Sequence, residues 1–169
     1  MTMAEAYLTE FEEEAKTTRR FLEQLPADKL GWRPHEKSRT AGQLALHIAV
    51  VPGAIVQMAA TDTASAPDFS RPNPEPATVA DVLKAHDESV ATVRQILPTF
   101  TDAAMQATWR MIGPDGKEAL ATPRAAFLRA IMLSHWIQHR GQFGVYLRLA
   151  GAKVPASYGP SGDEAAPPR

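Results

Sequence analysis

Apolar residues recur every three or four positions along much of the chain, and two such stretches predict amphipathic helices with clear ends. The first covers about residues 4–25 and is closed by Pro26. Another begins after Thr78, with Asp81 placed to complete the N-terminal cap, and is closed by Pro98. In both helices the apolar stripe predicts one face turned toward a common core.

The helix between these two begins with a capping box, because Gln43 follows Thr40 by three positions and each side chain can satisfy an orphan backbone N–H group. Pro52 predicts a kink, since it lacks a backbone donor. Apolar residues lie on every face, as in a helix that is buried on more than one side. We therefore hypothesise a homodimer formed through this helix.

The remaining segments predict one long connection, a hairpin and a last helix. Residues 61–76 contain four prolines and no periodicity, which predicts a crossover loop. The turn sequence 113–116 predicts a short hairpin. The last helix is predicted to begin with Thr122 as its cap and Pro123 at its first position, and to end at Gly151.

Four helices of comparable length with little strand signal predict an all-α fold, a four-helix bundle with a minor hairpin before helix 4. Residues 1–160 are expected to form a single domain, and residues 161–169 a mobile C-terminal tail.

Composition excludes several function classes. The chain has 169 residues and no cysteine, which excludes disulfides, cysteine-ligated zinc and a cysteine nucleophile. A formal net charge of −1 without a basic block gives no indication of nucleic-acid binding. The polar N-terminus differs from a signal peptide, and the most apolar stretch, 44–60, falls short of a bilayer span. These features predict a cytoplasmic protein with no membrane partner.

Three histidines are the candidate chemistry. His135 and His139 lie four residues apart in the predicted last helix, so both side chains share one face. His47 lies on an apolar face of the second helix and can face the same point from across the core. Three imidazoles would hold a divalent metal ion with at least one coordination position open. The alternative is that they are core residues with hydrogen-bonded partners.

Other catalytic motifs are missing. The residue after His135 is Trp136, where a zinc protease helix requires the glutamate that acts as general base. The sequence also lacks a Gly-rich phosphate loop and a Gly-x-Ser-x-Gly elbow. No catalytic residue is therefore assigned beyond the metal site.

Order, spacing and flanking residues together resemble the DinB-like (YfiT-like) family of metal-binding helical bundles. The resemblance covers nearly the whole chain. It rests on Trp32-Arg33-Pro34, His47, His135, His139, the following Arg140-Gly141-Gln142, and the tail residues Val154, Pro155, Tyr158 and Gly159.

The resemblance implies an up-down-down-up bundle with the long connection between helices 2 and 3. It also implies that His47, His135 and His139 bind a divalent ion, commonly nickel or zinc, and that the protein forms dimers. Members of known activity are often transferases that use a low-molecular-weight thiol such as bacillithiol, mycothiol or glutathione. Others are similar to metal-dependent hydrolases.

Five further residues are candidates for the surroundings of the metal. His86, on the inward stripe of the third helix, is either a fourth ligand, an acid–base group or a core histidine. Gln138 and Gln142 are candidates for hydrogen bonds to the ligand imidazoles. Arg140 would bind an anionic cofactor or pair with a carboxylate, and Tyr158 would form a pocket wall or anchor the tail.

Three functions follow from these candidates. The leading hypothesis is an enzyme that transfers a low-molecular-weight thiol to a small electrophile. The second is a metal-dependent hydrolase, for which Asp87 and Glu88 are the nearest candidate bases. The third is a non-catalytic, stress-associated protein that binds a metal or a small molecule, which a closed site with His86 as fourth ligand would favour.

Overall fold

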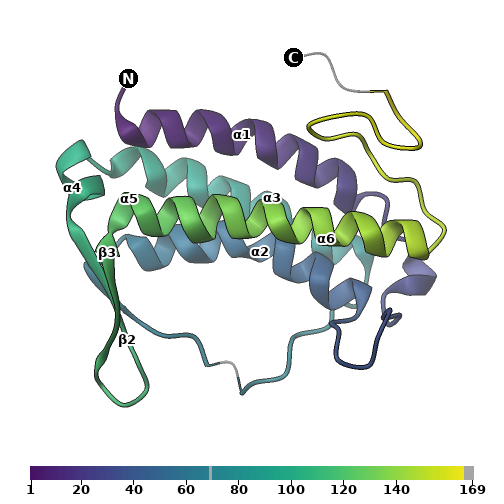
Figure 1. Cartoon of the computed structure of the whole chain (residues 1–169), viewed down its shortest axis with the longest axis horizontal. Coiled ribbons are helices and arrows are strands. Elements are labelled where there is room, and N and C mark those ends of the chain that lie inside the picture. Colours follow the sequence, from purple (N-terminus) through teal and green to yellow (C-terminus); the bar gives the residue numbers. More distant parts are fainter. Residues whose placement is uncertain (69, 166–169) are drawn as a thin grey trace.

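The computed structural model describes residues 1–68 and 70–165, and it is mostly helical with a small three-stranded sheet at one end (Figure 1). The helices are α1 (Met3–Leu22), α2 (Ala41–Ala59), α3 (Val79–Ile96), α4 (Asp102–Gln106), α5 (Arg124–Phe127), the π-helical segment η3 (Leu128–His135) and α6 (Trp136–Leu149). The strands are β1 (Thr63–Ser65), β2 (Thr108–Ile112) and β3 (Glu118–Pro123), and two short 3₁₀ turns are Ala27–Lys29 and Leu97–Thr99.

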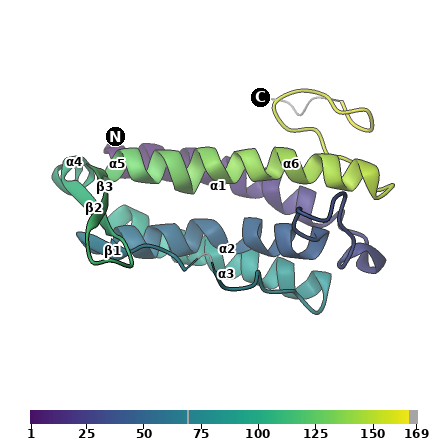
Figure 2. The same ribbon diagram turned by 60° about the horizontal axis from the view of Figure 1, so that its bottom comes forward.

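Four long helical segments lie side by side. α5, η3 and α6 follow one another without interruption and form a single rod. α2 packs against α3 and against this rod, while α1 packs against α3 and α6 (Figure 2). The fully buried aromatic side chains Phe11, Trp109, Trp136 and Phe143 lie in the core between them.

Local capping signals fix the starts of the helices. The capping boxes predicted for α2, Thr40 with Gln43, and for α3, Thr78 with Asp81, are both present. A third box, Thr2 with Glu5, begins α1. α1 ends at Leu22, three residues before the predicted boundary.

Pro52 lies inside α2 and changes its hydrogen bonding. Because proline has no N–H, the carbonyl of Ile48 lacks its helical donor. The indole Nε1 of Trp136 donates to this carbonyl instead, at 2.8 Å. One residue later, the backbone N–H of Gly53 donates to Ser89 Oγ at 2.8 Å. The helix irregularity thus attaches α2 to both α6 and α3.

The predicted hairpin is present as β2 and β3, but it belongs to a three-stranded sheet. β1 lies in the segment that was expected to be loop throughout, and it pairs in parallel with β2. Thr122 lies in β3 opposite Trp109 and is no helix cap, and the helix begins after Pro123 without a side-chain cap. The predicted start was wrong because strand pairing took the residues that the capping pattern assigned to the helix.

Arg124 joins the sheet end to α2. It is buried, and it donates to the carbonyls of Ala59, at 2.8 Å, and Ala104, and to the carboxylate of Asp62 at 2.7 Å. Trp109 Nε1 donates to the carbonyl of Met58 at 3.2 Å. The carbonyls of Met58 and Ala59, at the end of α2, thus accept hydrogen bonds from these two side chains, and Thr61 Oγ1 also donates to Met58.

The apolar surface of α2 is largely covered within the chain. By length and mean hydropathy, 1.4, α2 is the one helix among the described residues that could cross a membrane, but 56% of that window is buried. Val50 is its one large hydrophobic side chain with considerable exposure, 39%. Packing against α3 and α6 accounts for the apolar residues on every face of α2. These residues therefore no longer support a homodimer, which stays a prediction.

Beyond α6, the chain folds back against the helices. Ser161 Oγ donates to the carbonyl of Val154 at 2.6 Å, and Asp163 accepts hydrogen bonds from Arg148. Part of the predicted tail, residues 161–165, therefore makes defined contacts. Residues 166–169 lie outside the described part of the chain, and the predicted mobility stays a prediction.

Candidate metal centre

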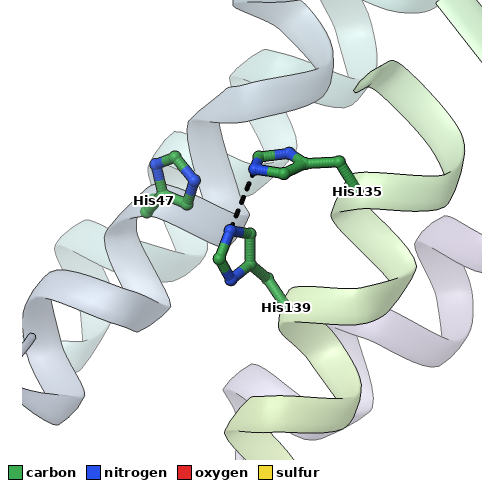
Figure 3. A group of neighbouring side chains, drawn as sticks. All are labelled: His47, His135 and His139. Carbon is green, nitrogen blue, oxygen red and sulfur yellow. Dashed lines mark hydrogen bonds between the residues drawn. The ribbon is translucent and has the colours of Figure 1, made fainter. Parts of the chain in front are cut away.

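His135 and His139 lie on one face of the rod, as their spacing predicted. The Nε2 atoms of the two rings are 3.0 Å apart (Figure 3). His135 is the last residue of η3 and His139 lies one turn into α6. The close approach of the two nitrogens turns both rings toward the same point.

His47 completes the group from α2. Its ring centroid lies 5.5 Å from that of His135 and 4.8 Å from that of His139, and the three ring planes are nearly perpendicular to one another. One ligand nitrogen from each histidine can be chosen so that all lie within 4.8 Å of one another. The three imidazoles therefore converge in the space between α2 and the rod (Figure 3).

The hydrogen-bonding state of the rings fits a metal ion. Buried ring nitrogens normally have a partner, yet His47 Nε2 has none among the described residues. Two nitrogens bound to one tetrahedral zinc ion would be about 3.3 Å apart, close to the 3.0 Å between His135 and His139. His135 Nδ1 also lacks a partner of standard geometry, although the Ile131 carbonyl is near enough to raise the pKa of this ring.

The surroundings favour neutral imidazoles, the form that binds a metal. Burial lowers the pKa of His47 to about 3, and the charges of Arg39, His139 and His135 act in the same direction. Burial also lowers the pKa of His135, with further contributions from His139 and Arg39. Little proton competition is therefore expected at these two rings near neutral pH.

Gln142 is the one predicted surrounding residue that contacts the group. Its Oε1 lies 2.9 Å from His139 Nδ1. A hydrogen bond from Nδ1–H to this oxygen leaves Nε2 of His139 as the free ligand atom. Gln142 thus selects the tautomer that a metal at the centre of the group requires.

A cavity of about 480 Å³ opens beside the imidazoles. Its lining combines the three histidines with apolar residues of α2 and η3 and with residues of the long connection. The lining residues are Arg39, His47, Val50, Val51, Ala54, Ile55, Met58, Pro67, Asn73, Ile131, His135 and His139. No carboxylate lies among these described lining residues. A small molecule bound in the cavity beside such an ion would therefore have no acidic side chain next to it.

Arg39 is a residue of the cavity that the sequence did not indicate. It directly precedes the Thr40 cap of α2, and its charge lowers the pKa of both His47 and His135. No local pattern distinguishes it from an ordinary loop arginine, because its place at the cavity depends on Asn73, in the distant connection between α2 and α3.

Other candidates lie elsewhere. His86 is buried on α3, beside Asp87, and lines a separate cavity of about 220 Å³, so it is not part of the histidine group. Arg140 is buried against α1, where it pairs with Glu14. Tyr158 donates to the same carboxylate at 2.9 Å and anchors the tail.

Gln138 and the candidate bases are also outside the cavity. Gln138 is exposed and does not line it. Asp87 forms an ion pair with Arg19, and Glu88 one with Lys84 at 3.8 Å. The carboxylates that a hydrolase was expected to use are therefore engaged on other faces of α3.

The π-helical segment is a feature that the sequence did not predict. It covers Leu128–His135 and so ends at a ligand candidate. A π-helix takes more residues per turn than an α-helix, and such segments often occur at functional sites.

Comparisons with known proteins show the family and the fold. The curated protein YrdA of Bacillus subtilis (strain 168) is 32% identical over 160 residues, which cover 94% of this chain and 89% of that protein. A DinB-like protein from Bacillus cereus ATCC 10987 superposes with a TM-score of 0.70 at 24% identity, covering 91% of this chain and 97% of the other. The DinB-like protein YjoA of Bacillus subtilis gives 0.67 at 20%, covering 89% and 96%.

A more distant fold neighbour is a mutant form of a mycothiol-dependent maleylpyruvate isomerase, with a TM-score of 0.54 at 14% identity. The match covers 92% of this chain and 67% of the isomerase. The sequence model of the DinB family matches residues 1–169, the whole chain. The chain is therefore a member of the DinB family.

Proposed function

We propose that this protein is a metal-dependent enzyme that transfers a low-molecular-weight thiol to a small electrophile. The observation that carries the proposal is the convergence of His47, His135 and His139, with one nitrogen of each within 4.8 Å of the others, at the wall of a cavity of about 480 Å³. Three protein ligands leave coordination positions for a small molecule in that cavity.

The chain's own residues would hold and orient the ion. His135 and His139 supply Nε2 atoms from one helix face, Gln142 fixes the tautomer of His139, and His47 approaches from α2. A divalent ion, nickel or zinc, would act as a Lewis acid that lowers the pKa of a thiol. The apolar wall formed by Val51, Ile55 and Met58 would exclude water from the reacting molecules.

A thiol nucleophile is favoured over water because of what the cavity lacks. Hydrolysis is assisted by a general base that takes a proton from water, and no carboxylate lines the cavity among the described residues. A thiol loses its proton far more readily and needs no such base. The fold neighbour that depends on mycothiol supports the same choice by analogy.

A non-catalytic metal- or ligand-binding protein is the second candidate. Its support would be a closed coordination sphere, but His86 lies in another cavity and leaves the group at three histidines. This function would be the conclusion if the protein binds the metal ion but binds no thiol.

The finer architecture and setting are part of the proposal. We take the four long segments to form the up-down-down-up bundle of the family, with the long connection between α2 and α3, and the protein to be cytoplasmic. A homodimer is also proposed, since Val145 and Leu149 remain 59% and 60% exposed on α6. Light scattering of the parent and of Val145→Glu would test the dimer.

Metal content is the decisive experiment. Tag-free protein purified without nickel resin is expected to contain about one divalent ion per chain, and His135→Ala/His139→Ala none. Thiols and electrophiles would then be screened with the loaded protein. A folded parent that takes up no ion would contradict the proposal and leave the histidines as core residues.

A further inference from the structure

Arg39 is a half-buried cation at the histidine cavity that forms no ion pair with any described carboxylate. Its Nε donates to Asn73 Oδ1 at 3.2 Å. Among the described arginines, Arg33 alone shares this lack of a carboxylate partner. Glu75, close to Asn73 in the sequence, accepts a hydrogen bond from Thr40 Oγ1 at 3.0 Å and forms no ion pair with Arg39. The two terminal guanidinium nitrogens of Arg39 thus remain available.

The position of Arg39 is fixed by three parts of the fold. Its backbone carbonyl accepts a hydrogen bond from the hydroxyl of Tyr146, on α6, at 3.3 Å. The next residue, Thr40, is the N-cap of α2. Gln43 Nε2 donates to the carbonyl of Asn73 at 3.3 Å and so holds the acceptor of the guanidinium in place. Arg39 is therefore held by its surroundings rather than left as a free surface side chain.

The cavity combines this cation with an apolar wall. Its described lining contains no acidic side chain, and Val51, Ile55, Met58 and Ile131 form its apolar part. A second, apolar cavity of about 170 Å³ shares Ile55, Met58 and Ile131 with the first. A ligand that fits both surfaces carries one anionic group and an apolar chain.

We propose that Arg39 binds the carboxylate of a small amphipathic ligand whose apolar chain lies against α2 and η3. The planar guanidinium matches a carboxylate through two parallel N–H···O bonds. The proposal rests on the proposed function, since it names the substrate class of the same cavity. The carboxylate belongs either to the thiol or to the electrophile, and the experiment below separates these sources.

The first test uses full-length protein freed of metal by a chelator, so that no ion can bind the carboxylate. Hexanoate and its neutral counterpart hexanamide are titrated into the protein by calorimetry. The parent is expected to bind hexanoate about tenfold more tightly than hexanamide, since hydrogen bonds between charged groups are worth more than neutral ones. Arg39→Gln should abolish this preference, and Arg39→Lys should retain part of it.

Arg33→Gln is the matched control. Arg33 lies in the same loop, also lacks a carboxylate partner, and does not line the cavity. This variant should keep the full preference for hexanoate. Equal binding of the two probes by the parent, absence of hexanoate binding, or a preference that survives in Arg39→Gln would each overturn the proposal.

The second test identifies the source of the carboxylate in zinc-loaded protein. If hexanoate still binds through Arg39 when propanethiol saturates the metal, the carboxylate belongs to the electrophile. If 3-mercaptopropionate binds more tightly than propanethiol, and Arg39→Gln removes the difference, it belongs to the thiol. Either result supports the role of Arg39, while loss of both effects in the parent contradicts it.

The two proposals fail separately. Metal uptake that depends on His135 and His139, without a preference for hexanoate in the metal-free parent, would refute the role of Arg39 and leave the metal centre intact. An Arg39-dependent preference for hexanoate in a protein that takes up no metal would refute the metal centre and leave the role of Arg39 intact.

Discussion

The indole nitrogen of Trp136 donates a hydrogen bond to the backbone carbonyl of Ile48 at 2.8 Å, and each of these residues directly follows a candidate metal ligand. The carbonyl is available because Pro52, four residues later, has no N–H. A proline in one helix and a tryptophan in another therefore set the separation between His47 and His135.

Replacing Trp136 with Phe is expected to weaken metal binding as well as the fold. The change leaves the Ile48 carbonyl buried and unpaired, which costs about 1–3 kcal/mol. Trp109→Phe is the control, since it removes an indole hydrogen bond to the Met58 carbonyl at the far end of α2, where Thr61 Oγ1 remains as a second donor. Urea unfolding should show losses in both variants, and metal titration a loss in Trp136→Phe alone. Equal metal affinity in the two variants would contradict the positioning role of Trp136.

Gln142→Ala should lower metal affinity by about tenfold to a hundredfold, the usual effect of removing the partner of a ligand histidine. The reason is that His139 Nδ1 loses the acceptor that fixes its tautomer. Gln138→Ala, an exposed change on the same helix, should leave the affinity unchanged. Competition with a chromophoric chelator measures both, and parent-like affinity in Gln142→Ala would show that the tautomer needs no such support.

Two glycines should respond oppositely to alanine. A Cβ atom at Gly53 would lie 2.9 Å from Ser89 Oγ and 3.0 Å from Ser89 Cα, so Gly53→Ala should destabilise the contact between α2 and α3. A Cβ atom at Gly141 meets nothing within 4 Å, and Gly141→Ala should stabilise α6 by up to about 1 kcal/mol. Thermal unfolding would compare them, and a stabilised Gly53→Ala would contradict the close packing.

His86 should make the fold less stable in acid. Burial lowers its pKa from about 6.5 despite the opposing effect of Asp87. As pH falls below that value, the unfolded chain takes up a proton that the folded chain does not, so the free energy of unfolding decreases. One such group contributes at most about 1.4 kcal/mol per pH unit. His86→Leu should reduce the slope of stability against pH in the metal-free protein.

His35→Gln serves as the control for this measurement, because His35 is exposed in a loop. Urea unfolding at several pH values between about 7 and 5 gives the slopes. A slope in His86→Leu equal to that of the parent would mean that burial of this imidazole does not oppose its protonation.

Features that depend on neighbouring residues were predictable from the sequence. The caps at Thr40 and Thr78 arise from side chains three positions apart, and the pairing of His135 with His139 follows from the helical repeat. Convergence of His47 with them required the family pattern, because spacing alone cannot show which faces of two distant helices meet.

Features that depend on distant segments were not predictable. The sequence around Thr122 predicted a helix cap, but in the structure Thr122 pairs with Trp109 in the sheet. Arg124 binds carbonyls of Ala59 and Ala104, which are distant from it in the sequence. Gly144 approaches Phe21 closely, as a glycine in a packed helix suggests, whereas Gly141 approaches nothing. Two glycines in one helix therefore differ in whether a neighbouring side chain requires them, and only the tertiary packing shows this difference.

The distribution of the three histidines along the chain has a consequence for folding during synthesis. His47 is made long before His135 and His139, and the segment between them includes α3 and the whole sheet. Translation proceeds at about 5–20 residues per second, so His47 waits several seconds for its partners. An ion held by all three histidines would therefore be bound with full affinity only after most of the chain has folded, and metal binding would report completed folding.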